Sequence, residues 1–223
     1  MKLIILDGVD NSGKTSTAKM LQRWFDKKGI EVGSVHFPSD IICRGELFKK
    51  VAHNPSEQTK QDFIEEVVEE EIAALFSLLK SGFEYIIVDR FLFSSLMFQG
   101  EEDDTRDFIF QRYERMFKFL GIDGTDVRHF IFTAKVADDN EETNETKKIF
   151  DSRAVQTEQR VWQLLELLKL RDIDNAYLTC HNVCEIDNIG RQGFGHSHTD
   201  EELDMLTISR CATIVKWIQE GER

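Results

Sequence analysis

The feature that most constrains the fold of this chain is a glycine-rich run that joins an apolar segment to a helical one. The run reads GVDNSGKT from Gly8 to Thr15 and fits the pattern G-x-x-x-x-G-K-[ST]. Glycines let such a loop curl so that its N–H groups face phosphate oxygens, and the following helix directs its positive end at the same anion. The pattern therefore predicts a loop that binds the phosphates of a nucleoside triphosphate.

Individual residues of this loop have separate expected roles. Lys14 is expected to reach the β- and γ-phosphates, and the hydroxyl of Thr15 is expected to ligate Mg²⁺. The predicted ATP-binding residues are Gly8, Asn11, Ser12, Gly13, Lys14, Thr15 and Ser16. The loop alone does not separate a kinase from an ATPase, a GTPase or a protein that only binds nucleotide.

Short apolar runs alternate with segments of helical periodicity along the chain. This alternation predicts one domain over residues 1–223, with a three-layer α/β fold in which helices flank a central five-stranded parallel sheet. The expected strands are Lys2–Leu6, Glu31–Phe37, Tyr85–Val88, His129–Thr133 and Ala176–Thr179. The expected helices are Thr15–Lys28, Gln58–Ser81, Thr105–Leu120, Ala154–Leu170 and Asp200–Gln219.

Three polar segments carry expectations of their own. The acidic segment that starts at Val136 predicts a loop or a lid, over residues 136–156. The segment Glu185–Thr199 contains three glycines and two histidines and predicts an excursion on the surface. The acidic run Glu65–Glu71 predicts a solvated face of its helix.

The charge balance and the hydropathy limit the partners. Lys and Arg number 28 against 41 Asp and Glu, a formal net charge of −13, which repels a nucleic-acid backbone. No apolar run is long enough for a signal-peptide core or a membrane span. Four irregularly spaced cysteines are typical of reduced thiols. We therefore expect a cytoplasmic protein with neither a nucleic acid nor a membrane as its partner.

A second polar constellation directly follows the expected strand Tyr85–Val88 and reads DRFLFSSLMFQG from Asp89 to Gly100. Residues at the carboxyl ends of parallel strands line the ligand crevice of an α/β fold. Arg90 can grip a phosphate with two parallel hydrogen bonds, and Asp89 can orient Mg²⁺ and its water or accept a proton. The pair predicts a second anion site beside the phosphate-binding loop.

Taken together, the two motifs resemble those of thymidylate kinases. That family carries G-x-D-x-x-G-K-[ST] and, after the third strand, D-R-[YFH]-x-x-S-x-x-[AM]-[YF]-Q-G. The matching residues here are Gly8, Asp10, Gly13, Lys14, Thr15, Asp89, Arg90, Phe91, Ser94, Met97, Phe98, Gln99 and Gly100. The resemblance implies an enzyme of dTTP synthesis, usually a homodimer, that uses Mg²⁺ with ATP to phosphorylate dTMP.

The resemblance also implies roles for single residues. Arg90 would hold the acceptor phosphate, and Asp10 and Asp89 would lie beside the transferring phosphoryl group. Phe63 would stack on the acceptor base, although its helical spacing alone would place it in the core. The implied acceptor-binding residues are Phe37, Arg44, Phe63, Arg90, Ser94, Phe98 and Gln99.

The chain departs from the family pattern at three positions. Asp40 and Val67 stand where many members have an arginine for the monophosphate, and Arg44 is the nearest cation to the first gap. Asn11 stands where some members carry a catalytic arginine, so cations of the lid are expected to stabilise the transition state. The candidate cations are Lys147, Lys148 and Arg153.

Two alternatives follow from these departures. The first is a deoxynucleoside monophosphate kinase with a different or broader acceptor range, such as dUMP or a 5-substituted dUMP. The second, from another class, is a non-catalytic protein that binds nucleotide as a signal or a structural ligand. The loop and the Asp89-Arg90 pair are intact, which favours an enzyme over the second alternative.

Overall fold

The computed structural model describes residues 2–8, 13–53, 56–100, 103–133, 183–187 and 200–220. The strands in these ranges are β1 (Lys2–Gly8), β2 (Val32–His36), β3 (Tyr85–Asp89), β4 (Val127–Thr133) and β5 (Val183–Asp187). The helices are α1 (Lys14–Lys27), α2 (Asp40–Cys43), α3 (Glu46–His53), α4 (Glu57–Lys80), α5 (Leu92–Gln99), α6 (Asp103–Leu120), the 3₁₀ turn η1 (Gly124–Asp126) and α8 (Asp200–Glu220).

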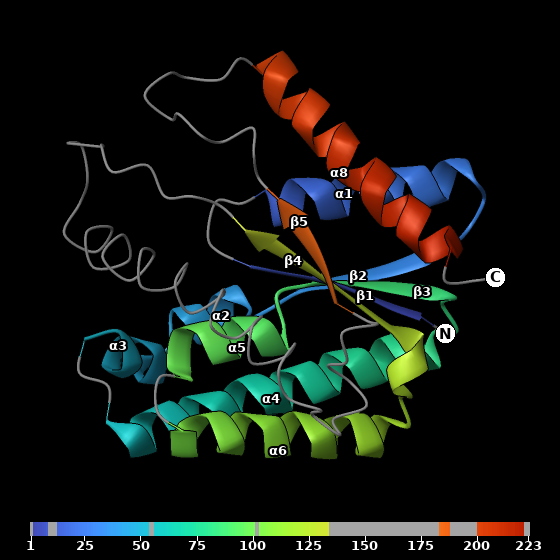
Figure 1. Ribbon diagram of the computed structural model, residues 1–223. Helices are drawn as coiled ribbons and strands as arrows, with labels where there is room; N and C mark the ends of the chain where they lie inside the picture. Colours follow the sequence, from blue (N-terminus) through green and yellow to red (C-terminus); the bar gives the residue numbers. More distant parts are fainter. Residues whose placement is uncertain are drawn as a thin grey trace.

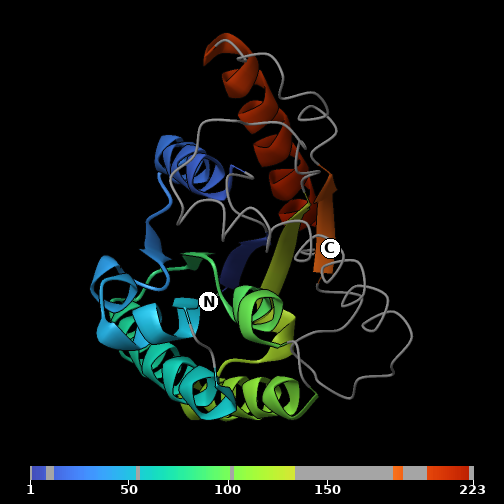
Figure 2. The ribbon, with the colours of Figure 1, turned by 90° about the vertical axis from the view of Figure 1, so that its left-hand side faces the viewer.

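The strands form one parallel sheet in the order β2-β3-β1-β4-β5 (Figure 1). Because β1 lies at the centre, the residues that follow it emerge in the middle of the carboxyl edge of the sheet. Figure 2 faces this edge, where α2, α3 and α5 begin or end. The predicted α/β fold, with a parallel sheet between helices, is confirmed.

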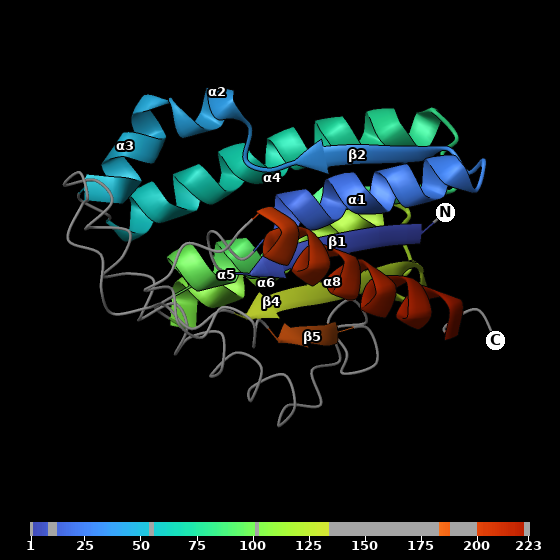
Figure 3. The same cartoon turned by 90° about the horizontal axis from the view of Figure 1, so that it is seen from above.

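Helices cover both faces of the sheet. Figures 1 and 3 show α1 and α8 side by side over one face, with α4, α5 and α6 beneath the other. Along β1, Leu3 and Ile5 pack in the core cluster of α4, α5 and α6, whereas Ile4 and Leu6 pack against α1 and α8. This alternation is the period of two that every strand imposes on its side chains. None of the helices within the described ranges is long and apolar enough to cross a membrane.

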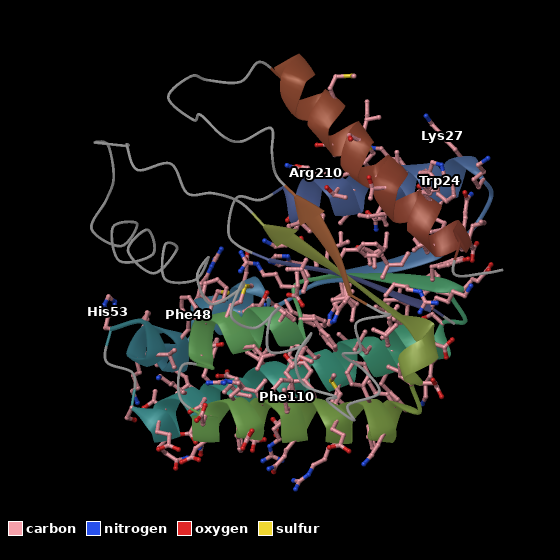
Figure 4. All side chains as sticks on the ribbon, in the orientation of Figure 1. Trp24, Lys27, Phe48, His53, Phe110 and Arg210 are labelled. Carbon is pink, nitrogen blue, oxygen red and sulfur yellow. The ribbon has the colours of Figure 1, made fainter. Side chains whose placement is uncertain are left out.

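A third, smaller cluster lies under the short helices α2 and α3. It consists of the buried residues Ile42, Val51, Phe63 and Val67, with Phe48 packed against it. The ring centroids of Phe48 and Phe63 are 5.8 Å apart, and Figure 4 marks Phe48 on α3. This cluster attaches α2 and α3 to the first half of α4, separately from the two main cores.

Several elements differ from the sequence prediction. The helices α2, α3 and α5 were not predicted; α5 has the sequence LFSSLMFQ and is buried almost all round, so it has no amphipathic period to detect. The predicted excursion at Glu185–Thr199 is wrong at residues 185–187, which belong to β5 and pair with β4. The strand expected at 176–179, the helix expected at 154–170 and the lid at 136–156 lie outside the described residues.

The prediction that Glu65–Glu71 is a solvated face is also wrong. The run covers about two helical turns, so its residues cannot all lie on one side of α4. Glu71 is 1% exposed, and its Oε1 accepts a hydrogen bond of 2.9 Å from the hydroxyl of Tyr113 on α6. Glu65 pairs with Arg112, so only part of the run meets solvent.

Candidate active site

The two predicted motifs meet at the carboxyl edge of the sheet. β1 carries the phosphate-binding loop and pairs with β3, in which Asp89 is the register partner of Leu6. The hydroxyl of Thr15, at the start of α1, donates a 2.5 Å hydrogen bond to Asp89 Oδ2. Residues 74 positions apart in the sequence therefore form one polar site.

Asp89 has a second partner on the neighbouring strand. His36 is its register partner on β2, and His36 Nδ1 lies 3.0 Å from Asp89 Oδ2. Burial raises the pKa of Asp89, but the hydrogen bonds with His36 and Thr15, helped by the charge of Lys14, outweigh it and hold the pKa below its ordinary value. His36 had no predicted role, because its place beside Asp89 depends on the pairing of β2 with β3.

The oxygen atoms of Asp89 and Thr15 suit a magnesium ion. Asp89 Oδ1 is buried and has no hydrogen-bond partner among the described residues, while Oδ2 lies beside the Thr15 hydroxyl. Mg²⁺ prefers hard oxygen ligands and completes its shell with water and nucleotide phosphates. The two residues predicted as metal ligands thus fit an ion that arrives with a nucleotide.

The described end of the phosphate-binding loop is tightly packed. Lys14 is 4% exposed, and its Nζ donates to the carbonyl oxygen of Gly8 at 3.0 Å. A Cβ at Gly8 would lie 2.2 Å from the carbonyl oxygen of Phe132, and φ is +133° there, so only glycine fits. Gly13 precedes α1 with φ of +87°, a conformation that also favours glycine.

The last helix also reaches this loop. Arg210 of α8 is buried, and its Nη1 lies where a Cβ on Gly13 would approach within 2.2 Å. Its guanidinium carbon is 5.9 Å from the ring centroid of Phe132, and Figure 4 marks the residue on α8. Arg210 had no predicted role, because it lies far from the loop in the sequence and belongs to no motif.

Arg90 has an unusual backbone conformation, with φ of +71°. Left-handed backbone costs a residue with a side chain about 1–2 kcal/mol. Its N–H donates to the carbonyl oxygen of Leu6 at 2.9 Å, which ties the turn to β1. Its guanidinium carbon lies 5.9 Å from the ring centroid of Phe98, so two predicted acceptor-binding residues lie close together.

Three other predicted acceptor residues are buried in or beside the main core. Phe37 packs in the core cluster of α4, α5 and α6, and Gln99 is buried at the end of α5. The hydroxyl of Ser94 donates to Asp7 Oδ1 at 2.6 Å, so this hydroxyl forms a buried contact within the protein. The acceptor roles of these residues stay predictions.

The structure separates the two remaining acceptor candidates. Phe63 is 4% exposed and belongs to the small cluster of α2 and α3, as expected for a core residue. The side chain of Arg44 is 82% exposed and lies 3.4 Å from Asp40, one turn earlier. Arg44 therefore faces solvent and does not fill the gap that Asp40 leaves. Asp10, Asn11, Ser12, Lys148 and Arg153 lie outside the described residues.

The two motifs of the site lie in a segment that matches a protein family. Residues 6–116 match the thymidylate kinase family model. We call this segment the thymidylate kinase region; it contains both motifs and all of α1 to α5. The resemblance predicted from the sequence is thereby confirmed.

Curated relatives match the same part of the chain. "Probable thymidylate kinase" of Thermococcus gammatolerans is 32% identical over 108 residues, which cover 43% of this chain and 51% of the relative. The protein of the same name from Pyrococcus horikoshii is 32% identical over 105 residues, covering 43% and 50%. This chain thus spans about half the length of the curated relatives it matches.

Solved structures match the fold over nearly the whole chain. Thymidylate kinase from Ehrlichia chaffeensis superposes with a TM-score of 0.59 at 16% identity, covering 98% of each chain. Thymidylate kinase from Candida albicans, described as having broad substrate specificity, gives 0.56 at 15% identity and covers 100% of this chain and 93% of its own. At such identities the likeness shows the fold, and the thymidylate kinase region supplies the link to the family.

Proposed function

We propose that this protein is a nucleoside monophosphate kinase that transfers the γ-phosphoryl group of ATP to dTMP, giving ADP and dTDP. The observation that carries the proposal is the meeting of the two motifs, in which Thr15 of the loop donates to Asp89 beside Arg90. A phosphate-binding loop alone would fit any nucleotide-binding protein. A phosphoryl acceptor needs a second anion-binding group at the same sheet edge, and Arg90 provides one.

Positioning and charge do most of the work in such a reaction, and no covalent intermediate with the enzyme is required. Lys14 would neutralise the β- and γ-phosphate oxygens, and Arg90 would align the acceptor phosphate with them. Asp10 and a lid cation, Lys148 or Arg153, complete the proposed catalytic set. Mg²⁺, held by Thr15 and Asp89, would reduce the charge repulsion between donor and acceptor.

A second candidate differs only in the acceptor. Asp40 and Val67 stand where many thymidylate kinases have arginines, Arg44 faces solvent, and Val67 is buried in the small cluster. The acceptor phosphate would then have fewer cationic ligands in the described part of the chain. This observation favours an acceptor range that extends to dUMP or 5-substituted dUMP.

The experiment that tests the proposal measures ADP release from MgATP with dTMP, dUMP, dCMP, dAMP, dGMP and thymidine as separate acceptors. We expect turnover to be fastest with dTMP. Comparable turnover with dUMP would move the acceptor range while keeping the reaction. ATP binding without turnover on any of them would contradict the proposal and favour a non-catalytic nucleotide-binding protein.

The proposal includes a homodimer and a cytoplasmic location, as the family resemblance implies. Phe76 of α4 and Phe119 of α6 support the dimer, since they are 43% and 69% exposed and their rings lie 6.5 Å apart. Apolar side chains that gather on a surface often mark an interface. Light scattering on a size-exclusion column would show a mass near twice that of the chain, and a Phe119→Ser variant would lower it. Cell fractionation would test the location.

A further inference from the structure

Asp7, the residue before the phosphate-binding loop, is a fully buried acid at the centre of the sheet. Asp7 lies two residues after Ile5 and four after Leu3 on β1, so its side chain is directed at the same face of the sheet, which α5 covers. Burying an ionised carboxylate is costly unless hydrogen-bond donors surround it. We therefore expect hydrogen-bond donors around the carboxylate of Asp7.

The hydrogen bonds that Asp7 accepts come from the beginning of the second motif, and His129 of β4 lies beside them. Asp7 Oδ1 accepts from the N–H of Phe91 at 2.8 Å, from the N–H of Ser94 at 3.1 Å and from the Ser94 hydroxyl at 2.6 Å. Oδ2 accepts from the N–H of Phe93 at 3.1 Å and lies 3.5 Å from Nε2 of His129. Burial raises the pKa of Asp7, but the contacts with His129, Ser94 and Phe91 hold it below its ordinary value.

These donors are the free N–H groups at the start of α5. A helix leaves its first N–H groups without intrahelical partners, and a side chain near its start normally accepts from them. Phe91, the residue before α5, makes no such side-chain contact. Asp7 of β1 takes the place of the missing cap of α5, and its negative charge suits the positive end of the helix.

The same contacts constrain Arg90. The N–H of Arg90 donates to Leu6, and the next N–H along the chain donates to Asp7, so two consecutive residues of the turn are tied to two consecutive residues of β1. A residue in a strained conformation persists only where its surroundings over-determine it. The left-handed backbone of Arg90 is such a case.

We propose that Asp7 is a positioning residue for the acceptor phosphate, acting by fixing the start of α5 and with it the direction of the Arg90 guanidinium. Asp7 also precedes Gly8, whose carbonyl oxygen accepts from Lys14. The residue that fixes the start of α5 thus directly adjoins the donor loop along the chain. The inference rests on the proposed function, in which Arg90 binds the acceptor phosphate.

The test compares acceptor and donor binding in an Asp7→Asn variant by titration calorimetry with dTMP and with MgADP. The amide keeps the shape but loses one acceptor, so we expect dTMP to bind about tenfold more weakly, the effect of one hydrogen bond to a charged group. MgADP binding should change by less than about twofold. An Ile109→Val variant, altered in the same core away from the turn, should leave both unchanged. Equal losses for both ligands in Asp7→Asn would overturn the proposal.

A double-mutant cycle with Arg90→Gln separates positioning from general loosening. If Asp7 acts through Arg90, the double variant binds dTMP no more weakly than Arg90→Gln alone. Additive losses would overturn the proposal, since they would mean that Asp7 affects the acceptor by another route.

Two further measurements cover the remaining outcomes. If Asp7→Asn does not fold, the Ser94→Ala variant is used instead, since it removes only the 2.6 Å hydrogen bond to Asp7. We expect faster amide hydrogen exchange at Phe91 and Phe93 in this variant. Unchanged exchange would overturn the proposal. If the wild-type protein binds none of the acceptors, the proposed function fails, and the crystal structure of Asp7→Asn then decides whether Asp7 fixes the backbone of Arg90. Arg90 leaving the left-handed region supports it, and an unchanged φ overturns it.

Discussion

The sheet edge and the helical layer beside it hold their polar side chains in opposite ways. At the sheet edge, Asp7 and Asp89 are buried, hydrogen bonds from neighbouring elements hold each carboxylate, and the pKa of each is lowered. In the helical layer, Arg44 is exposed and forms an ion pair with Asp40, one helical turn earlier. Glu71 is buried, and burial raises its pKa well above its ordinary value, more than the hydrogen bond from Tyr113 lowers it.

This difference separates the chemistry from the choice of acceptor. Strand register fixes the polar groups at the sheet edge, so a change there disturbs several contacts at once. The small cluster under α2 and α3 is joined to the rest through α4, so its side chains can change with little effect on the sheet. We therefore expect phosphoryl transfer to depend on the edge and acceptor preference to depend on the helical layer.

The strongest test of this contrast is Lys14→Ala. Loss of one preorganised positive charge beside the phosphates should lower kcat by about 10²–10³-fold. Steady-state ADP release with dTMP measures it, and the circular dichroism spectrum checks the fold. A loss of less than about fivefold would show that the buried Lys14 contributes to the structure of the loop and not to phosphoryl transfer.

Thr15→Val should have the next largest effect. Valine keeps the shape but removes the hydroxyl that donates to Asp89, so we expect kcat to fall by about tenfold or more and the Mg²⁺ requirement to rise. Thr15→Ser, which retains the hydroxyl, is the matched control and should stay near wild-type activity. Equal activities of the Val and Ser variants would exclude a role for the hydroxyl.

Glu71→Gln tests the helical layer through stability. Burial raises the pKa of Glu71 well above its ordinary value, more than the hydrogen bond from Tyr113 lowers it. The folded protein therefore keeps a proton that the unfolded chain releases above about pH 4.3, and its free energy of unfolding falls as pH rises. Glutamine mimics the protonated acid, so the variant should gain stability over wild type from pH 5 to pH 7, by up to about 1.4 kcal/mol per pH unit.

Urea unfolding at several pH values measures this difference. Glu69→Gln, an exposed acid on the same helix, is the control and should show no such gain. A constant difference between Glu71→Gln and wild type across this pH range would mean that Glu71 is ionised in the folded protein.

The smallest expected effect is that of Arg44→Ala. An exposed ion pair is worth about 0–1 kcal/mol, and the side chain of Arg44 is exposed to solvent, so KM for dTMP should change by less than about twofold. A rise of tenfold or more would break the contrast, because Arg44 would then replace the arginine that Asp40 displaces.

The sequence predicted which residues gather at the sheet edge, for a physical reason. Glycine loops and strand-end carboxylates have patterns that can be read locally, so Lys14, Thr15, Asp89 and Arg90 were identified before their contacts were known. The roles of His36 and Asp7 depend on which strands are neighbours. The chain order does not reveal that β1 lies between β3 and β4.

The helical layer was harder to predict. The acidic run on α4 predicted a face exposed to solvent along its whole length. The burial of Glu71 could not be predicted, because its partner Tyr113 lies 42 residues later on another helix. The helix α5 was not predicted, because it is apolar on nearly all sides and is capped by Asp7 of β1, which is distant in the sequence. Both features depend on contacts between segments far apart in the sequence.

The central place of β1 has a consequence for how the protein is made. The neighbours of this strand, β3 and β4, begin at Tyr85 and Val127, so a growing chain cannot pair β1 on either side until those segments have left the ribosome. Pairings over such sequence separations slow folding and leave apolar edges open meanwhile. The apolar Leu3–Leu6 segment is therefore where a nascent chain most needs shielding from aggregation.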